Sequence, residues 1–128
     1  MNSTIATIKD VLQIFPDLEL SILIGSQAKK NAGPESDWDI ALRWKKNVGA
    51  LDALQQTELL KQNISDATHI HKDQIDIIDM TKARLAMRAV IAEEGTVLKG
   101  EDTLAWNHFL TQTWAELEDY YWRKNHAA

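Results

Sequence analysis

The 128-residue sequence contains no cysteine, only two prolines and five glycines. Without cysteine the chain cannot form a disulfide framework, a Cys-ligated zinc site, an iron–sulfur cluster or a thiol nucleophile, which fits a reducing compartment. The longest uninterrupted apolar run, Ala89 to Ala92, has four residues, whereas a membrane-spanning helix needs about twenty. The N-terminus also lacks the apolar block of a signal peptide. We therefore expect a cytoplasmic protein without a membrane partner.

The chain also lacks an excess of positive charge. Fourteen Lys and Arg against nineteen Asp and Glu give a net charge of −5. Because nucleic-acid binding depends largely on cations that neutralise phosphates, we expect no direct nucleic-acid partner. Length and composition are those of one globular domain, with 45% hydrophobic and 26% charged residues. We expect a single domain over residues 1–128, with a core at about 4–100 and a C-terminal helix at about 102–124.

Hydrophobic periodicity predicts helices that alternate with strands. Apolar residues three and four apart indicate helices, at 4–15, 50–62, about 81–95 and 102–124. Alternating or continuous apolar runs indicate strands, at 18–24, 37–44, 74–80 and 96–99. Thr81 is the expected N-cap of the third helix and Gly95 its stop, while residues 27–36 form a polar loop with a Gly33-Pro34 turn. The fold class is α/β (α+β), a mixed sheet flanked by helices.

The residues that carry chemistry follow the first predicted strand and open the second. Gly25-Ser26 lets the backbone approach an anion and offers N–H groups and a hydroxyl to phosphate oxygens. Ten residues later, Asp37 and Asp39 point to the same side of a strand, roughly 7 Å apart. Two such carboxylates repel each other unless a cation lies between them, and Mg²⁺ binds carboxylates together with substrate phosphates.

A third carboxylate on a neighbouring strand would complete a site for two metal ions about 3.5–4 Å apart. Asp76, within the apolar segment Ile75-Asp76-Ile77-Ile78, is the expected residue. Asp79 lies three positions further along, so a regular strand places it on the opposite face. We expect Asp79 to end the strand or cap the next helix.

This combination resembles the polymerase beta nucleotidyltransferase superfamily. The resemblance rests on Ser26, the ten-residue spacer, Asp37-Trp38-Asp39, the later Ile75-Asp76-Ile77-Ile78 and the segment 92–98. The small size is similar to the minimal nucleotidyltransferase (MNT) antitoxins of HEPN/MNT toxin–antitoxin pairs. The resemblance spans about residues 18–100.

The resemblance implies a role for each matching residue. Gly25, Ser26 and Lys29 would hold the triphosphate of ATP, Asp37 and Asp39 would ligate two Mg²⁺ ions, and Asp76 would ligate the catalytic ion and help activate the acceptor hydroxyl. The implied activity is transfer of AMP from ATP to a tyrosine of a HEPN ribonuclease toxin. That modification, or docking alone, would silence the toxin.

The sequence departs from the family pattern after Ser26. The family often has Gly-Ser-Arg-Ala-Arg-Gly, whereas this chain has Gln27 at the first basic position and Lys29 at the second. Between residues 26 and 46 the basic side chains outnumber the acidic ones by two, so we expect a basic rim that attracts a triphosphate; it comprises Lys29, Lys30, Arg43, Lys45 and Lys46 against Glu35, Asp37 and Asp39.

Other interpretations stay open. A binding module with an idle site would neutralise its partner by occlusion, and a small-molecule nucleotidyltransferase would need a further domain for its acceptor. His69, His71 and Asp73 alternate like metal ligands on a strand but lack a fourth partner, so we expect a solvated strand end or a partner-facing surface, and no zinc site. Aromatic residues crowd the last helix, where core packing and partner contact are equally supported and nucleotide-base stacking is a third, less supported alternative. They are Trp106, Phe109, Trp114, Tyr120, Tyr121 and Trp122.

Overall fold

The computed structural model describes residues 3–29, 33 and 36–127. Helices and strands alternate along the chain, and a 3₁₀ turn at Lys72–Gln74 precedes the third strand. The elements are α1 (Ser3–Leu12), β1 (Leu18–Ile24), α2 (Ser26–Lys29), β2 (Trp38–Trp44), α3 (Ala50–Thr68), β3 (Ile75–Asp79), α4 (Leu85–Glu94), β4 (Thr96–Lys99) and α5 (Leu104–His126). None of the described helices is both long enough and apolar enough to cross a membrane.

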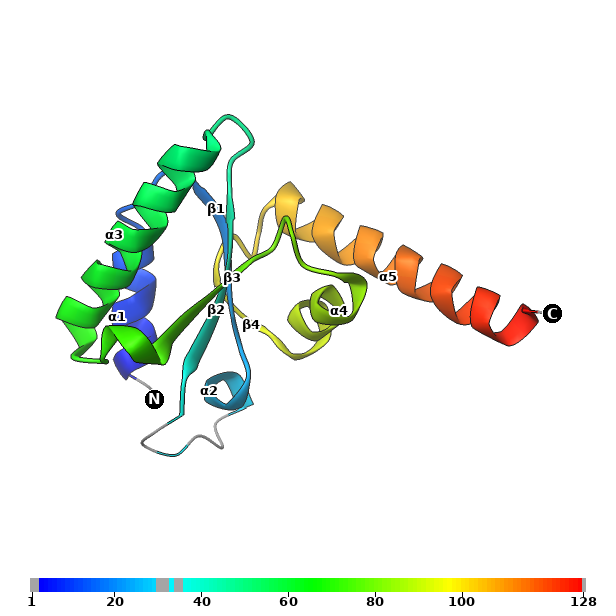
Figure 1. Cartoon of the computed structure of the whole chain (residues 1–128), viewed down its shortest axis with the longest axis horizontal. Helices are drawn as coiled ribbons and strands as arrows, with labels where there is room; N and C mark the ends of the chain where they lie inside the picture. Colours follow the sequence, from blue (N-terminus) through cyan, green and yellow to red (C-terminus); the bar gives the residue numbers. More distant parts are fainter. Residues whose placement is uncertain (1–2, 30–32, 34–35, 128) are drawn as a thin grey trace.

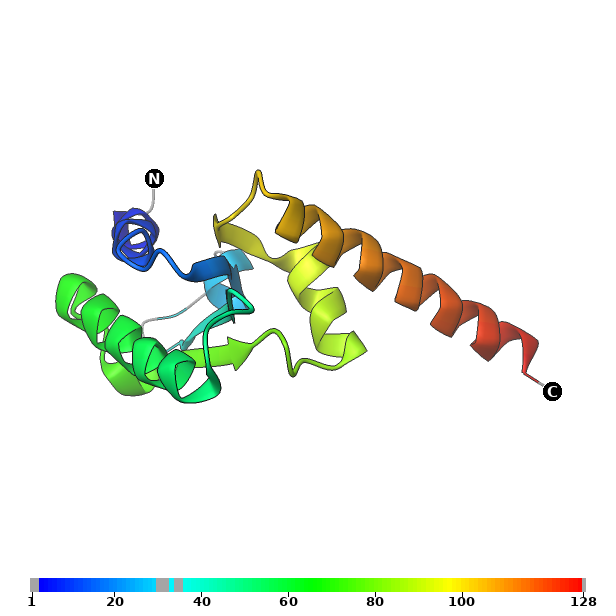
Figure 2. The same cartoon turned by 90° about the horizontal axis from the view of Figure 1, so that it is seen from above.

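The four strands form one mixed sheet in the order β3-β2-β1-β4. Strand β1 runs antiparallel to β2 and to β4, whereas β2 and β3 are parallel. Helices α1 and α3 cover one face of this sheet and α4 and α5 cover the other, as the two perpendicular views show (Figures 1 and 2). The expected mixed sheet flanked by helices is therefore confirmed.

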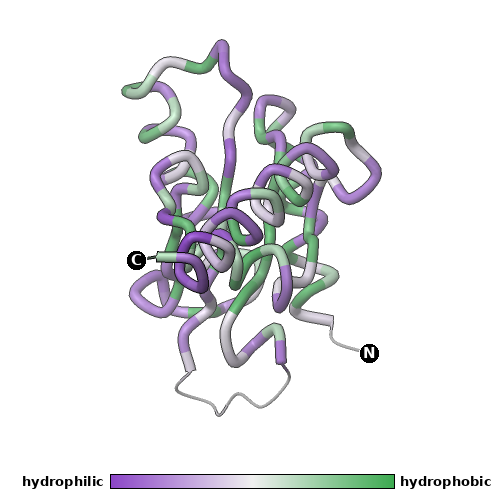
Figure 3. Tube along the Cα trace, turned by 90° about the vertical axis from the view of Figure 1, so that its right-hand side faces the viewer, coloured by the Kyte–Doolittle hydropathy of each residue, from purple (hydrophilic) through white to green (hydrophobic). Residues whose placement is uncertain are grey.

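Each face of the sheet has its own hydrophobic core. Alternation along β2 assigns Trp38, Ile40 and Leu42 to the core under α1 and α3, and Ala41 to the core under α4 and α5. The hydrophobic stretches follow the strands through the middle of the molecule, while the helices alternate between hydrophobic and hydrophilic residues (Figure 3). The predicted alternation of β2 is correct, and it places Asp39 on the face that α4 and α5 cover.

Several boundaries differ from the sequence prediction, and α1 ends at Leu12 instead of residue 15. Helix α3 continues past Asn63 to Thr68 and ends where His69 adopts a left-handed φ of 64°. Helix α2 begins at Ser26 and extends to Lys29, into the segment expected to be a loop, and the expected Gly33-Pro34 turn lies partly outside the described residues. Thr81 does not cap α4, whose N-cap is Arg84; instead the Thr81 amide and hydroxyl both donate to Asp79.

Helix α5 packs on the body by its first half and extends beyond it by its second (Figures 1 and 2). Trp106 and Phe109 are buried and stack with ring centroids 5.4 Å apart. Farther along, the exposed fraction rises from 43% at Trp114 to 61% at Trp122. The aromatic residues of this helix thus divide between core packing and exposed surface.

Candidate functional site

Two of the predicted carboxylates lie on neighbouring strands at one end of the sheet. Strands β2 and β3 are parallel, and their register pairs Asp39 with Asp76. Because both residues have the same strand parity, their side chains share one face of the sheet. Asp37 is exposed and comes just before β2, two residues from Asp39. The topology therefore brings the three predicted carboxylates to one edge of the molecule.

The electrostatics of Asp39 show how closely these groups interact. Partial burial raises the pKa of Asp39, and the negative charges of Asp76 and Asp37 raise it further. A hydrogen bond between the Asp39 and Asp76 side chains acts in the same direction, since a protonated carboxyl can donate to its neighbour. A cation placed among these residues would relieve the repulsion.

Gly25 lies against the Asp39 carboxylate. A Cβ atom on Gly25 would stand 2.6 Å from Oδ2 of Asp39, and the backbone has a φ of +78°, which disfavours any other residue. Strand β1 pairs Ile24 with Asp39, so the turn that follows β1 is held beside the carboxylates. Ser26 opens α2 immediately afterwards and is partly exposed.

The segment after Ser26 makes contacts that its sequence did not reveal. Lys29, expected to face a triphosphate, forms an ion pair with Glu94 at 2.6 Å, so its charge is compensated at the end of α4. Gln27, which replaces a basic residue of the family pattern, donates to the carbonyl of Ser36 at 3.3 Å. Gln27 thus connects α2 to the chain that leads into Asp37.

The expected basic rim does not surround the carboxylates. Arg43 pairs with Glu19 at 2.8 Å, and Lys45 and Lys46 follow the far end of β2, where they line a separate cavity. Five residues separate Asp39 from Trp44, about 17 Å at 3.3–3.4 Å per residue. Lys30, a further basic residue of that expected rim, and the acidic Glu35 lie outside the described residues.

The histidine-rich segment before β3 is not a strand end. His69 ends α3 and His71 is the N-cap of the 3₁₀ turn, where its side chain accepts from the Asp73 amide. The prediction of a strand there was wrong because alternation over three residues does not distinguish a strand from a helix end followed by a turn. Within the described part of the chain, no three His, Asp or Glu side chains are arranged to enclose a metal ion.

The donor chemistry nevertheless suits Mg²⁺. Asp37, Asp39 and Asp76 supply only oxygen ligands, and the interactions that raise the pKa of Asp39 are those a cation would reverse. Gly25 leaves open the space beside Asp39 that any larger side chain would fill. Asp79 is exposed and accepts two hydrogen bonds from Thr81, so it ends β3 as expected and lies away from this cluster.

The sheet order, the flanking helices and the turn between β1 and α2 together define a nucleotidyltransferase fold. The polymerase beta nucleotidyltransferase family matches residues 6–104, and the chain therefore belongs to that family. A comparison with curated protein sequences gives no match.

Solved structures share the fold over nearly the whole chain. One chain of a toxin–antitoxin crystal structure with AMP-PNP is 20% identical at a TM-score of 0.70, and the match covers 94% of this chain and 93% of that one. A complex of a tri-AMPylated Shewanella oneidensis HEPN toxin with its MNT antitoxin gives 19% identity and a TM-score of 0.65, with coverage of 96% and 92%. A chain of the toxin–antitoxin structure MntA–HepT is 19% identical at a TM-score of 0.65, and the match covers 98% of this chain and 94% of that one.

Proposed function

We propose that this protein is an antitoxin that transfers AMP from ATP to a tyrosine hydroxyl of a cognate HEPN ribonuclease toxin. The observation that carries the proposal is the pairing of Asp39 with Asp76, beside Asp37 and under the Gly25-Ser26 turn. Family membership supports nucleotidyl transfer. The choice of AMP and of a protein acceptor follows the complexes that share the fold, one with AMP-PNP and one with an AMPylated HEPN toxin.

The carboxylates would bind the metal ions, and the turn would bind the phosphates of ATP. Asp37 and Asp39 would hold two Mg²⁺ ions, with Asp76 contributing to one of them; the ions would neutralise the triphosphate and lower the pKa of the acceptor hydroxyl. Gly25 lets the chain turn beside Asp39 without a side chain in the way. The Ser26 hydroxyl and nearby backbone N–H groups would bind phosphate oxygens.

The reaction is a displacement at the α-phosphorus. The tyrosine oxygen forms a bond to the α-phosphorus, the bond from that phosphorus to the bridging oxygen breaks, and pyrophosphate leaves. The hydroxyl proton passes to Asp76 or to solvent. Asp76 suits this step because it is exposed and β3 is an edge strand of the sheet, so an acceptor can approach from outside.

Labelled ATP tests the chemistry. The purified partner, taken as the product of the neighbouring gene, is incubated with this protein, Mg²⁺ and ATP labelled at either the α- or the γ-phosphorus. We expect the α-label to enter the partner and the γ-label to stay out, with no transfer by the Asp37→Asn/Asp39→Asn variant. Entry of the γ-label would indicate phosphorylation, and absence of both labels would remove the proposed reaction.

The second candidate function is neutralisation by binding alone. The exposed aromatic residues on the projecting half of α5 favour it, since such residues dominate protein interfaces. It predicts that Asp37→Asn/Asp39→Asn still suppresses the partner's ribonuclease activity fully at equal stoichiometry. Under the proposed enzymatic function, that variant leaves the partner's ribonuclease active, because the partner is not modified.

A further inference from the structure

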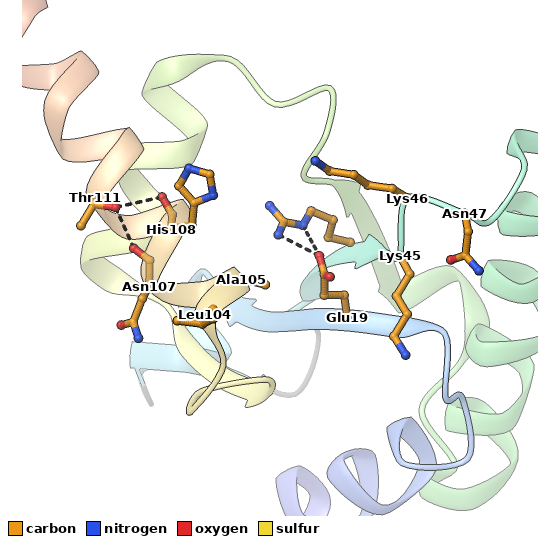
Figure 4. A pocket seen from close by; sticks show the side chains of 10 residues that line it. Glu19, Lys45, Lys46, Asn47, Leu104, Ala105, Asn107, His108 and Thr111 are labelled. Atoms are coloured by element: carbon orange, nitrogen blue, oxygen red, sulfur yellow. Dashed lines mark hydrogen bonds and ion pairs between the residues drawn. The ribbon is translucent and has the colours of Figure 1, made fainter.

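A cavity of about 820 Å³ lies at the opposite end of β2 from the carboxylates. One side of the cavity is formed by Glu19 on β1 and by Arg43, Lys45 and Lys46 at the end of β2. The opposite side is formed by the first two turns of α5 (Figure 4). The contacts of α5 place it on the same side of the sheet as Asp39 and Asp76. The cavity and the carboxylates therefore belong to one continuous side of the molecule.

The charge of this cavity contrasts with that of the protein. Its lining carries three permanent cations and one carboxylate, on a chain whose net charge is −5. The carboxylate of Glu19 is already engaged, because Arg43 donates to it through Nε at 2.9 Å and pairs with it through Nη2 at 2.8 Å. Lys45 and Lys46 form no ion pair with any described residue. Two positive charges thus remain available.

Other side chains give the cavity a mixed character. The Lys46 side chain extends toward the wall where His108 lies, and Asn107 and Thr111 are on the same turns of α5 (Figure 4). Leu104, at the start of that helix, is 86% exposed. An exposed leucine across the cavity from unpaired lysines suits a ligand with both apolar and anionic groups.

The cavity continues along α5 into a second one of about 310 Å³. The two share Arg43 and His108, and the second adds polar groups, including Gln112 and the ion pair of Arg88 with Glu116. From His108 to Glu116 the helix advances about 12 Å at 1.5 Å per residue. A groove of this length with dispersed hydrogen-bonding groups suits an extended peptide better than a compact small molecule.

We propose that this groove, lined by Arg43, Lys46, Leu104 and His108, binds an acidic segment of the toxin partner. The inference rests on the proposed function and adds to it a docking site distinct from the catalytic carboxylates. Charge complementarity identifies the occupant: free cations on an otherwise acidic protein would attract an acidic partner segment and orient it. Docking there would raise the local concentration of the acceptor tyrosine at the far end of the same side.

Charge reversal tests the docking site. Lys45→Glu/Lys46→Glu is compared with Lys9→Glu/Lys61→Glu, which changes the net charge equally on the side covered by α1 and α3. Binding of the purified neighbouring-gene product is measured at low and high salt. We expect the groove variant to bind at least tenfold more weakly than wild type at low salt, with a flatter salt dependence, and the control to stay within twofold. Thermal stability and AMP-PNP binding should be unchanged in both variants.

Each alternative result has a defined meaning. Partner binding by the groove variant within twofold of the control would overturn the docking site and leave the proposed reaction standing. Failure of the wild-type protein to bind or modify the partner would overturn both. A single-stranded RNA oligonucleotide that binds wild type and not the groove variant would show that the groove is a nucleic-acid site and would refute the proposal that it binds a peptide. Restoration of binding to the groove variant by lysine substitutions in one acidic segment of the partner would confirm the pairing.

Discussion

Replacing Asp76 by asparagine should make the protein more stable and, at the same time, inactive. In the folded protein, burial and the charges of Asp76 and Asp37 raise the pKa of Asp39 above its ordinary value of 3.8. The folded state therefore binds the Asp39 proton more tightly than the unfolded chain does, and the free energy of unfolding falls as the pH rises from 3.8 through the raised pKa. At neutral pH the repulsion within the cluster therefore lowers the free energy of unfolding.

The size of that cost follows from the sheet. Asp39 and Asp76 are register partners on adjacent strands, and like charges in such positions cost about 0.2–1 kcal/mol. Asp76→Asn removes one charge, and its amide can donate a hydrogen bond to the ionised Asp39. We expect a gain of up to about 1 kcal/mol at pH 7, which for a domain of this length raises Tm by roughly 3–5 °C.

Thermal and urea unfolding at pH 7 and pH 3, without divalent ions, measure this effect. The gain should shrink at pH 3, because protonation of Asp39, whose pKa is raised, removes the repulsion that the substitution relieves. Asp79→Asn is the matched control, because Asp79 is on the same strand but accepts from Thr81 instead of facing Asp39. A destabilised Asp76→Asn, an equal gain at pH 3, or an equal gain in the control would show that repulsion between Asp39 and Asp76 does not lower stability.

Three further predictions address the turn, the metal and the core. Gly25→Ala should lower nucleotidyl transfer at least tenfold and Tm by several degrees, because its Cβ meets Asp39 and its φ is +78°; partner labelling and thermal melts check both. Millimolar Mg²⁺ with AMP-PNP should raise the Tm of wild type but not of Asp37→Asn/Asp39→Asn, and an equal rise would place binding elsewhere. Ser21→Ala should leave stability unchanged or raise it by up to about 1 kcal/mol, because the buried Ser21 hydroxyl has no hydrogen-bond partner among the residues that the structure describes. A clear loss in urea unfolding would show that a partner exists.

The sheet and its carboxylates were accessible to sequence reasoning because strand alternation is a short-range rule. Trp38, Ile40 and Leu42 alternate with Asp39 and Ala41, and this period of two fixes which side chains share a face. The expectation that Asp76 lies on a strand near Asp39 rested on an acidic residue set in an otherwise apolar segment, whereas the register that pairs the two came from the structure. Parity also predicted that Asp79 would point away from the cluster.

What the sequence did not reveal depends on long-range geometry. The ion pair of Lys29 with Glu94 joins residues 65 positions apart in the chain, and no local pattern encodes it. Counting charges between residues 26 and 46 suggested a basic rim, but β2 carries Lys45 and Lys46 to the other end of the sheet. Likewise, Thr81 is a residue type that often caps helices, but it forms a turn with Asp79, and α4 begins only at Leu85.

The intact mass of the neighbouring-gene product after co-expression with this protein shows whether AMP is transferred. We expect an increase of one or more AMP units, and no increase when the co-expressed protein carries Asp37→Asn/Asp39→Asn. Fragmentation should place the added mass on tyrosine. An unmodified partner that still co-purifies in a stable complex would contradict the enzymatic account and leave neutralisation to binding alone.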